Sequence, residues 1–273
     1  MSAVAPPVVE ARSLALRFGP RLLWDGLTFD LHAGEFMAVL GPNGTGKTSL
    51  IRILLGLLTP SAGTVSVGGR GPAGARAQIG YVPQQRAFDR DVPLRGRDLV
   101  RLGLDGHRWG LGLTSKASNE RVRRALQAVG ADGYGELPVG RLSGGEQQRL
   151  RIAQALVSDP ALLLADEPLL SLDLSSQRTV VDLLDRRRRE SGTPVVFVTH
   201  DVNPILRVAD TVLYLAPGRW AIGPPAEVLT TETLSRLYDT PVDVLRVRGR
   251  VVVVGTPDDD GIHHHDHASA GSH

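Results

Sequence analysis

The segment GPNGTGKT at residues 41–48 limits the possible folds more than any other part of the sequence. A short apolar run at residues 36–40 precedes it, and an apolar segment of helical length, residues 48–58, follows it. This order of strand, glycine loop and helix matches G-x-x-x-x-G-K-[ST], the pattern of a phosphate-binding P-loop. Glycines let the backbone approach phosphates closely, so that N–H groups of the loop and of the helix N-terminus face the negative charge. The segment therefore predicts a nucleotide site, against the alternative of a glycine-rich turn before a core helix.

The side chains of this loop and of a later strand predict how Mg²⁺ would be held. Lys47 would reach the β- and γ-phosphates, and the Thr48 hydroxyl would coordinate the metal. The apolar run at residues 162–166 ends in Asp166, which would join the Mg²⁺ shell, while Glu167 would polarise the attacking water. The loop residues predicted to bind the nucleotide are Gly41, Asn43, Gly44, Gly46, Lys47, Thr48 and Ser49.

The order of apolar segments predicts an α/β fold with a mainly parallel sheet. Residues 8–31 are expected to form antiparallel strands, and residues 85–156 are mainly helical in pattern. Further strands are predicted at residues 36–40, 64–67, 161–165, 194–198 and 211–215, helices at 48–58, 119–129, 144–156 and 180–189, and a hairpin at 242–254 that turns at Arg248-Gly249.

Composition excludes several classes of function. The chain has no cysteine, which rules out disulfides, thiolate metal sites and thiol catalysis. No run of 18 apolar residues predicts a transmembrane helix, and the N-terminus lacks the basic and apolar regions of a secretion signal. The net charge of +2 gives no reason to expect nucleic-acid binding. We therefore expect a cytoplasmic protein.

The segment LSGGE at residues 142–146 is expected to open a helix. Ser143 can cap this helix, with Glu146 completing a capping box. Two glycines at a helix start also form a second anion-binding end. Since the P-loop already covers one side of a nucleotide, a second phosphate-binding element would be most useful if it served another molecule.

Together these motifs resemble the ATP-binding subunits of ABC transporters over roughly residues 8–230. The resemblance implies a P-loop NTPase (RecA-like) core with an antiparallel β subdomain and a helical subdomain at about residues 85–156, within a domain of residues 8–255. Residues 41–48 are similar to Walker A, 142–146 to the LSGGE signature, and 162–166 to Walker B. YVPQ at residues 81–84 resembles the Q-loop, in which Gln84 would contact Mg²⁺ or water.

The same resemblance assigns further residues. SLD at residues 171–173 is similar to the D-loop, which places Asp173 at the nucleotide interface, and His200 resembles the switch histidine that contacts the γ-phosphate. Phe18 lies near the place where the family stacks an aromatic ring on adenine, although packing in the core is an alternative. The family implies two subunits paired head to tail, with each ATP between one P-loop and the partner's Ser143, Gly144 and Gly145.

The stretch from residue 198 to 255 is similar to ATPases of zinc and manganese uptake systems. This implies import of a metal ion through a separate membrane permease, with an extracytoplasmic substrate-binding protein, and a position on the cytoplasmic face of the membrane. Another cargo such as a siderophore, or export, stays open. A DNA-associated ABC ATPase is disfavoured, because the chain has one cassette, no heptad run and no cysteine.

Residues 256–273 form a histidine-rich tail that is expected to be disordered. Clustered imidazoles are good ligands for zinc, nickel or copper. The tail can be a metal sensor or buffer, a solvated tail without function, or a purification tag. The candidate ligands are His263, His264, His265 and His267.

Overall fold

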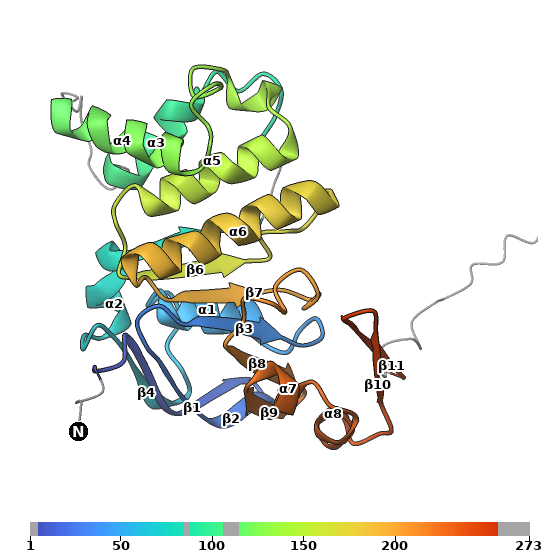
Figure 1. Cartoon of the computed structure of the whole chain (residues 1–273). Coiled ribbons are helices and arrows are strands. Elements are labelled where there is room, and N and C mark those ends of the chain that lie inside the picture. Colours follow the sequence, from blue (N-terminus) through green and yellow to red (C-terminus); the bar gives the residue numbers. More distant parts are fainter. Residues whose placement is uncertain (1–4, 85–87, 106–114, 256–273) are drawn as a thin grey trace, which may run out of the picture.

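The computed structural model describes residues 5–84, 88–105 and 115–255 of the 273-residue chain. A six-stranded sheet forms its centre, in the order β5-β6-β7-β3-β8-β9 (Figure 1). The first five strands of that order run parallel, and β9 pairs antiparallel with β8. The strands are β3 (Phe36–Leu40), β5 (Ile79–Val82), β6 (Leu162–Asp166), β7 (Val195–Val198), β8 (Thr211–Ala216) and β9 (Arg219–Gly223).

The central strands of this sheet are buried along their whole length. Every residue of β3, β6 and β7 is buried, as expected for parallel strands that are covered on both faces. These three strands are neighbours in the sheet. Their carboxyl ends therefore lie side by side, and the loops that follow them meet at one edge of the sheet.

A second, antiparallel sheet covers one side of the central sheet. Its order is β2-β1-β4, and it is drawn below the central sheet in Figure 1. Residues of α1 pack in one apolar cluster with residues of both sheets. The elements are β1 (Val9–Phe18), β2 (Arg21–Leu31), β4 (Ala62–Val67) and α1 (Lys47–Leu54), with the short helices α2 (Pro72–Ala75) and η1 (Arg76–Gln78) after β4.

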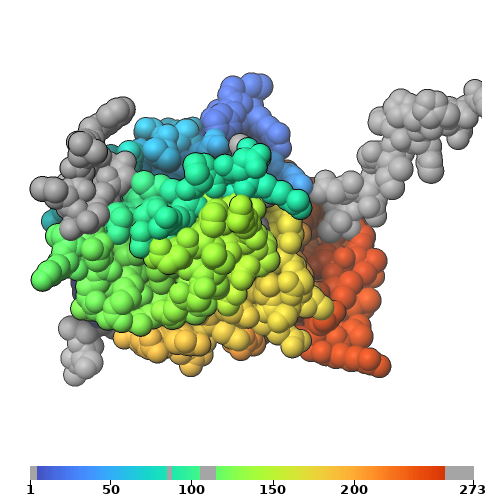
Figure 2. Space-filling model, turned by 90° about the horizontal axis from the view of Figure 1, so that it is seen from above, coloured from blue at the N-terminus to red at the C-terminus, as the bar shows by residue number. Residues whose placement is uncertain are grey.

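Helices lie on the other side of the central sheet. Figure 2 shows this helical region forming one face of the molecule, with the C-terminal elements at its edge. α6 packs between the sheet and the more distant helices (Figure 1). The elements are α3 (Gly96–Asp105), α4 (Lys116–Ala128), η2 (Val139–Arg141), α5 (Gly144–Leu156) and α6 (Leu174–Ser191).

The chain continues after β9 through α7 (Pro225–Val228) and α8 (Thr231–Tyr238) to a hairpin of β10 (Asp243–Val247) and β11 (Arg250–Val254). Arg248 and Gly249 both have positive φ, at 49° and 78°. A two-residue turn between antiparallel strands favours this conformation because it matches their twist. The predicted hairpin and its turn are confirmed. Across the described residues, no helix combines the length and apolarity that crossing a bilayer requires.

Candidate ATP site

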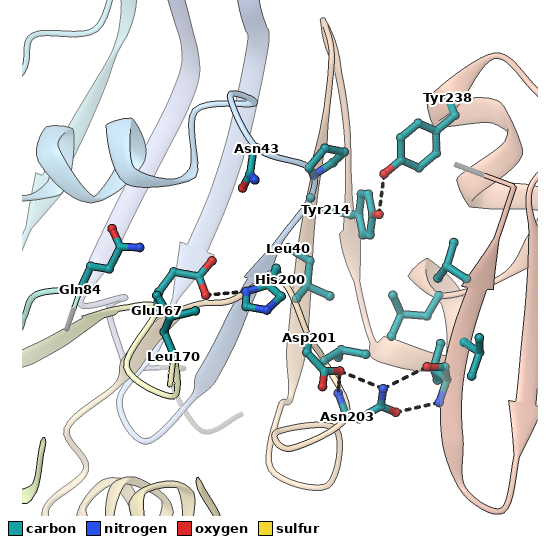
Figure 3. A pocket seen from close by; sticks show the side chains of 17 residues that line it. Leu40, Asn43, Gln84, Glu167, Leu170, His200, Asp201, Asn203, Tyr214 and Tyr238 are labelled. Carbon is teal, nitrogen blue, oxygen red and sulfur yellow. Dashed lines mark hydrogen bonds and ion pairs between the residues drawn. The ribbon is translucent and has the colours of Figure 1, made fainter. Parts of the chain in front are cut away.

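Three adjacent strands of the central sheet deliver the candidate site. Val198 at the end of β7 pairs with Val39 on one side and with Asp166 on the other. The P-loop follows β3, the acidic pair ends β6, and His200 follows β7. Figure 3 shows Asn43, Glu167 and His200 meeting at this edge. Residues separated by more than 150 positions in the chain thus surround one space.

The P-loop backbone lies too close to its neighbours for side chains at two glycines. Gly41 has a φ of +135°, and a Cβ there would lie 2.0 Å from the carbonyl oxygen of Leu215 on β8. Gly46 has a φ of +96°, and a Cβ there would lie 2.7 Å from Nε1 of Trp24 on β2. Only glycine adopts such angles without strain, so both contacts fix the loop between β8 and the antiparallel sheet.

Lys47 starts α1 and turns its ammonium back over the loop. Its Nζ donates hydrogen bonds to the carbonyl oxygens of Gly41, at 2.6 Å, and Pro42, at 2.9 Å. Burial lowers the pKa of Lys47, and the nearby carboxylates of Glu167 and Asp166 oppose this effect. A buried cation held by neutral carbonyls is an incomplete pairing, which an anion such as a phosphate would complete.

Asp166 and Thr48 form the candidate metal site. The Thr48 hydroxyl donates to Asp166 Oδ1 at 3.4 Å. Burial raises the pKa of Asp166, while the Thr48 hydrogen bond opposes the rise. A buried carboxylate beside a hydroxyl, with a second carboxylate at Glu167, is the oxygen-only donor set that Mg²⁺ prefers, so the residues present fit this ion.

Glu167 and His200 interact directly. His200 Nδ1 and Glu167 Oε2 are 2.9 Å apart (Figure 3). Glu167 has a φ of 49°, and its N–H donates to the carbonyl oxygen of Val198 at 3.0 Å. A positive φ is uncommon for a residue other than glycine and is often associated with functional sites. The backbone therefore holds the Glu167 side chain at the edge of the sheet, facing the loop after β7.

Two cavities meet at this edge. One of about 390 Å³ lies over the P-loop, and one of about 720 Å³ extends from the loop toward the C-terminal hairpin. Asn43, Gln84 and Glu167 line both. The smaller cavity is also lined by Phe18, Arg21, Leu23, Gly44, Gly46, Lys47, Thr48 and Ser49.

Phe18 and Arg21 form the outer wall of the smaller cavity. Phe18 is 50% exposed, so its interpretation as a core side chain is wrong. It pairs across the β1–β2 turn with Arg21, whose guanidinium donates to the carbonyl oxygen of Gly44 at 3.2 Å. Sequence reasoning missed Arg21, since an arginine after Gly19-Pro20 looks like an ordinary turn residue.

The segment at residues 142–146 lies apart from these cavities and includes none of their lining residues. Ser143 caps α5 in a capping box with Glu146; the Ser143 hydroxyl donates to the Glu146 carboxylate at 2.7 Å. This hydrogen bond lowers the pKa of Glu146. Both Ser143 and Gly144 are exposed. The structure thus separates this predicted anion-binding end from the P-loop of the same chain.

Asp173 caps α6 beside the same segment. Its carboxylate accepts hydrogen bonds from the N–H groups of Ser175 and Ser176 and from the Ser176 hydroxyl. A Cβ at Gly145 would lie 2.6 Å from the Ser176 hydroxyl oxygen. The start of α5 therefore rests on the first turn of α6.

The tail histidines His263, His264, His265 and His267 lie outside the described residues. Within residues 5–84, 88–105 and 115–255, no three His, Asp or Glu side chains are grouped so that they could hold a metal ion by themselves. The Thr48–Asp166 pair needs further ligands, such as phosphate oxygens.

The family described as ABC transporter matches residues 24–170. The chain belongs to the ABC transporter family. It is 33% identical over 248 residues to the manganese transport system ATP-binding protein MntB of Halalkalibacterium halodurans, covering 91% of this chain and 98% of that protein. To the protein of the same name in Bacillus subtilis it is 32% identical over 230 residues, covering 84% of this chain and 92% of that protein.

A solved structure gives the same result for the ABC fold. A chain from a metal-chelate type ABC transporter in an inward-facing conformation superposes with a TM-score of 0.76 at 28% identity, covering 90% of this chain and 96% of the other. The chain is thus the ATP-binding subunit of an ABC transporter, and it hydrolyses ATP.

Proposed function

We propose that this ABC ATPase powers the import of a metal ion, zinc or manganese, through a separate membrane permease. The convergence of Lys47, Asp166, Glu167 and His200 on adjacent strand ends carries the hydrolytic part of the proposal. The cargo is supported by the manganese transport relatives, which match 91% and 84% of this chain.

The binding step uses the P-loop and the outer wall of its cavity. The loop N–H groups and the start of α1 face the phosphates. The Lys47 ammonium exchanges its two carbonyl partners for phosphate oxygens. Phe18 presents its exposed ring to the adenine, because stacking requires only an aromatic face. The P-loop residues that serve in binding are Gly41, Asn43, Gly44, Gly46, Lys47, Thr48 and Ser49.

In this proposal Thr48 and Asp166 would hold Mg²⁺, and Gln84 would contact the ion or the water beside it. The ion, when bound, neutralises charge on the phosphates. The raised pKa of Asp166 means that protons compete for this ligand more than for an exposed aspartate. Ion binding therefore weakens as the pH falls through that pKa.

Hydrolysis needs a base for water and a group that steadies the γ-phosphate. The water oxygen bonds to the γ-phosphorus while the bond from that phosphorus to the ADP oxygen breaks. Glu167 accepts a proton from the water, and ADP and phosphate are the products. His200, bonded to Glu167 through Nδ1, contacts the γ-phosphate through its other ring nitrogen.

A second subunit completes each site in this proposal. Ser143, Gly144 and Gly145 are separate from the P-loop of their own chain and contact the nucleotide of a partner copy, with Asp173 at the same interface. For the Ser143 hydroxyl to donate to a phosphate, it must leave the Glu146 carboxylate. Closure of the dimer thus exchanges one hydrogen bond of the capping box for one to ATP.

The remaining partners follow from the transporter class. We propose a homodimer on the cytoplasmic face of the membrane, bound to an integral membrane permease and served indirectly by an extracytoplasmic substrate-binding protein. No nucleic-acid partner is expected. The tail histidines are proposed to bind zinc and adjust the ATPase rate.

Uptake of radioactive zinc and manganese tests the proposal in the native cell, with the gene deleted and then restored as wild type or as Glu167→Gln. We expect uptake to fall on deletion and to recover with the wild type alone. Unchanged uptake under metal limitation would remove the metal cargo and leave the ATPase chemistry in place. Rescue by Glu167→Gln would instead contradict the role of Glu167.

A further inference from the structure

The C-terminal hairpin is hydrogen-bonded to the loop that carries His200. The side-chain amide of Asn203 makes two bonds with the backbone of Val251 on β11. Its Nδ2 donates to the Val251 carbonyl oxygen at 3.0 Å, and its Oδ1 accepts from the Val251 N–H at 2.8 Å. Asn203 thus pairs with one residue of the hairpin in the manner of a neighbouring strand (Figure 3).

The same amide also closes the loop itself. Asp201 Oδ1 accepts from the backbone N–H of Asn203 at 2.9 Å and from its Nδ2 at 2.8 Å. One step earlier, the Thr199 hydroxyl bonds to the backbone of Asp201, and the Thr199 N–H donates to the Val39 carbonyl oxygen at the end of β3. His200 therefore lies between an anchor on the sheet and an anchor on the hairpin.

His200 needs such anchors because little else holds it. Its side chain is 59% exposed, and its bond to Glu167 is made through one ring nitrogen. An exposed side chain loses rotamer freedom when it is fixed in one orientation. The position of the ring is then set mainly by the backbone of its loop, and small displacements of a catalytic group cost rate steeply.

The hairpin is attached to the core through a few of its side chains, while most of its residues are exposed. Val251 is 5% exposed, and Val244 and Val253 pack against the main core. Between these strands and His200 lies the cavity of about 720 Å³. The bonds of Asn203 join the hairpin to the loop, while the neighbouring Val202 is buried in the same core cluster as Val251.

We infer that Asn203 is a positioning residue for His200 and that the β10–β11 hairpin is the anchor through which it acts. The inference rests on the proposed role of His200 at the γ-phosphate. It gives the C-terminal hairpin a part in hydrolysis that its distance from the P-loop in sequence does not suggest.

Asn203→Ala in the full-length protein tests this, with Thr231→Val as the matched control. The Thr231 hydroxyl accepts from the Val244 N–H on β10 at 3.0 Å, so this change also removes a side-chain bond to the hairpin but leaves the His200 loop intact. With MgATP, we expect kcat to fall about tenfold in Asn203→Ala with KM within about twofold of wild type. Thr231→Val should retain the wild-type rate.

His200→Ala and the double variant separate positioning from general damage. If Asn203 acts through His200, the double variant has the rate of His200→Ala alone, because the two changes remove one function. The inference would be overturned if the losses of kcat in the two single variants multiply in the double variant. It would also be overturned if Asn203→Ala has a wild-type kcat while His200→Ala is impaired. Either result would leave the proposed function standing. A wild-type rate in His200→Ala would overturn both.

Should Asn203→Ala fail to fold, Asn203→Asp provides the same test. It keeps the size of the side chain and the acceptor for the Val251 N–H, but it loses both Nδ2 donors and places a carboxylate beside Asp201. We expect the same selective loss of kcat, and a wild-type kcat in a folded Asn203→Asp protein would refute the positioning role.

Discussion

Lys47→Met separates the stability of the P-loop from its function. At a pH below the lowered pKa of Lys47, folding carries the full cost of burying the ammonium, and this cost disappears as the pH rises from that pKa toward the ordinary value. Two charge-assisted hydrogen bonds to carbonyls, worth about 1.5–3 kcal/mol each, oppose a burial cost of several kcal/mol. Methionine removes both contributions, so we expect the melting temperature without nucleotide to stay within about 2 °C of wild type or to rise.

In the presence of ATP, by contrast, we expect the melting temperatures of the wild type and Lys47→Met to differ. At 100 times its Kd, ATP stabilises the wild type by about 2.7 kcal/mol, which is roughly 5 °C for a chain of this length. Loss of two bonds to phosphate, about 3 kcal/mol or more in total, weakens affinity by roughly 100-fold or more. At the same ATP concentration the variant then gains less than about 0.5 kcal/mol, or about 1 °C.

Differential scanning fluorimetry with and without MgATP measures both values, and Lys116→Met is the control. Lys116 is the other lysine of the chain and is exposed at the start of α4. The reasoning is refuted if Lys47→Met without nucleotide melts more than about 5 °C below wild type, because the ammonium would then be required for the fold. An unchanged response to MgATP would refute the binding role.

Two further predictions concern the same edge of the sheet. Glu167→Gln keeps the size of the side chain and an acceptor for His200, so ATP affinity should persist while kcat falls about 100-fold or more; equal losses in equilibrium ATP binding would argue against a role as base. Gly41→Ala should lower the free energy of unfolding in urea by about 3 kcal/mol or more, because its Cβ would lie 2.0 Å from the Leu215 carbonyl oxygen. Gly71→Ala, where a Cβ meets nothing within 4 Å, should change it little, and equal effects of the two would show that the clash is relieved.

The buried strands and the signature helix could be predicted from the sequence because their signals are local. The runs predicted at residues 36–40, 161–165, 194–198 and 211–215 are β3, β6, β7 and β8 within one residue at each end. Each is a short apolar segment bounded by turn residues, which a parallel sheet buried on both faces produces. The helix predicted at residues 144–156 is α5, whose start is fixed by the Ser143 cap.

Two predicted helix boundaries were wrong, because the apolar pattern of the sequence does not follow the backbone geometry there. The helix predicted at residues 48–58 ends at Leu54, because Gly56 adopts a φ of +65° and rests on α2, where a Cβ would lie 2.5 Å from the Ala73 nitrogen. The helix predicted at residues 180–189 instead begins at Leu174. Its polar first turn shows no apolar period, and the Asp173 cap decides its start.

Two strands of the central sheet were missed for a related reason. β5 has four residues with a glycine among them, and β9 is a half-buried edge strand. Neither has the length or the continuous apolar run that identifies a buried strand in isolation. Their pairing with β6 and β8 supplies the stabilisation that their own sequences do not show.

Whether a site residue could be predicted also depends on whether its partners are near it or distant in the sequence. Residues proposed to act through one contiguous loop, such as Lys47 and Thr48, are visible in the spacing of the motif. Asn203 is not, because its partner Val251 lies 48 positions later, and an asparagine after a strand equally suits a simple turn. Any residue of the hairpin with the right geometry can supply the backbone groups that bond to the Asn203 amide. Such a hydrogen bond therefore leaves no pattern in a single sequence. The support proposed for His200 can therefore be found only after the fold has brought the hairpin beside its loop, which is why the Asn203 variants test the structure rather than the motif.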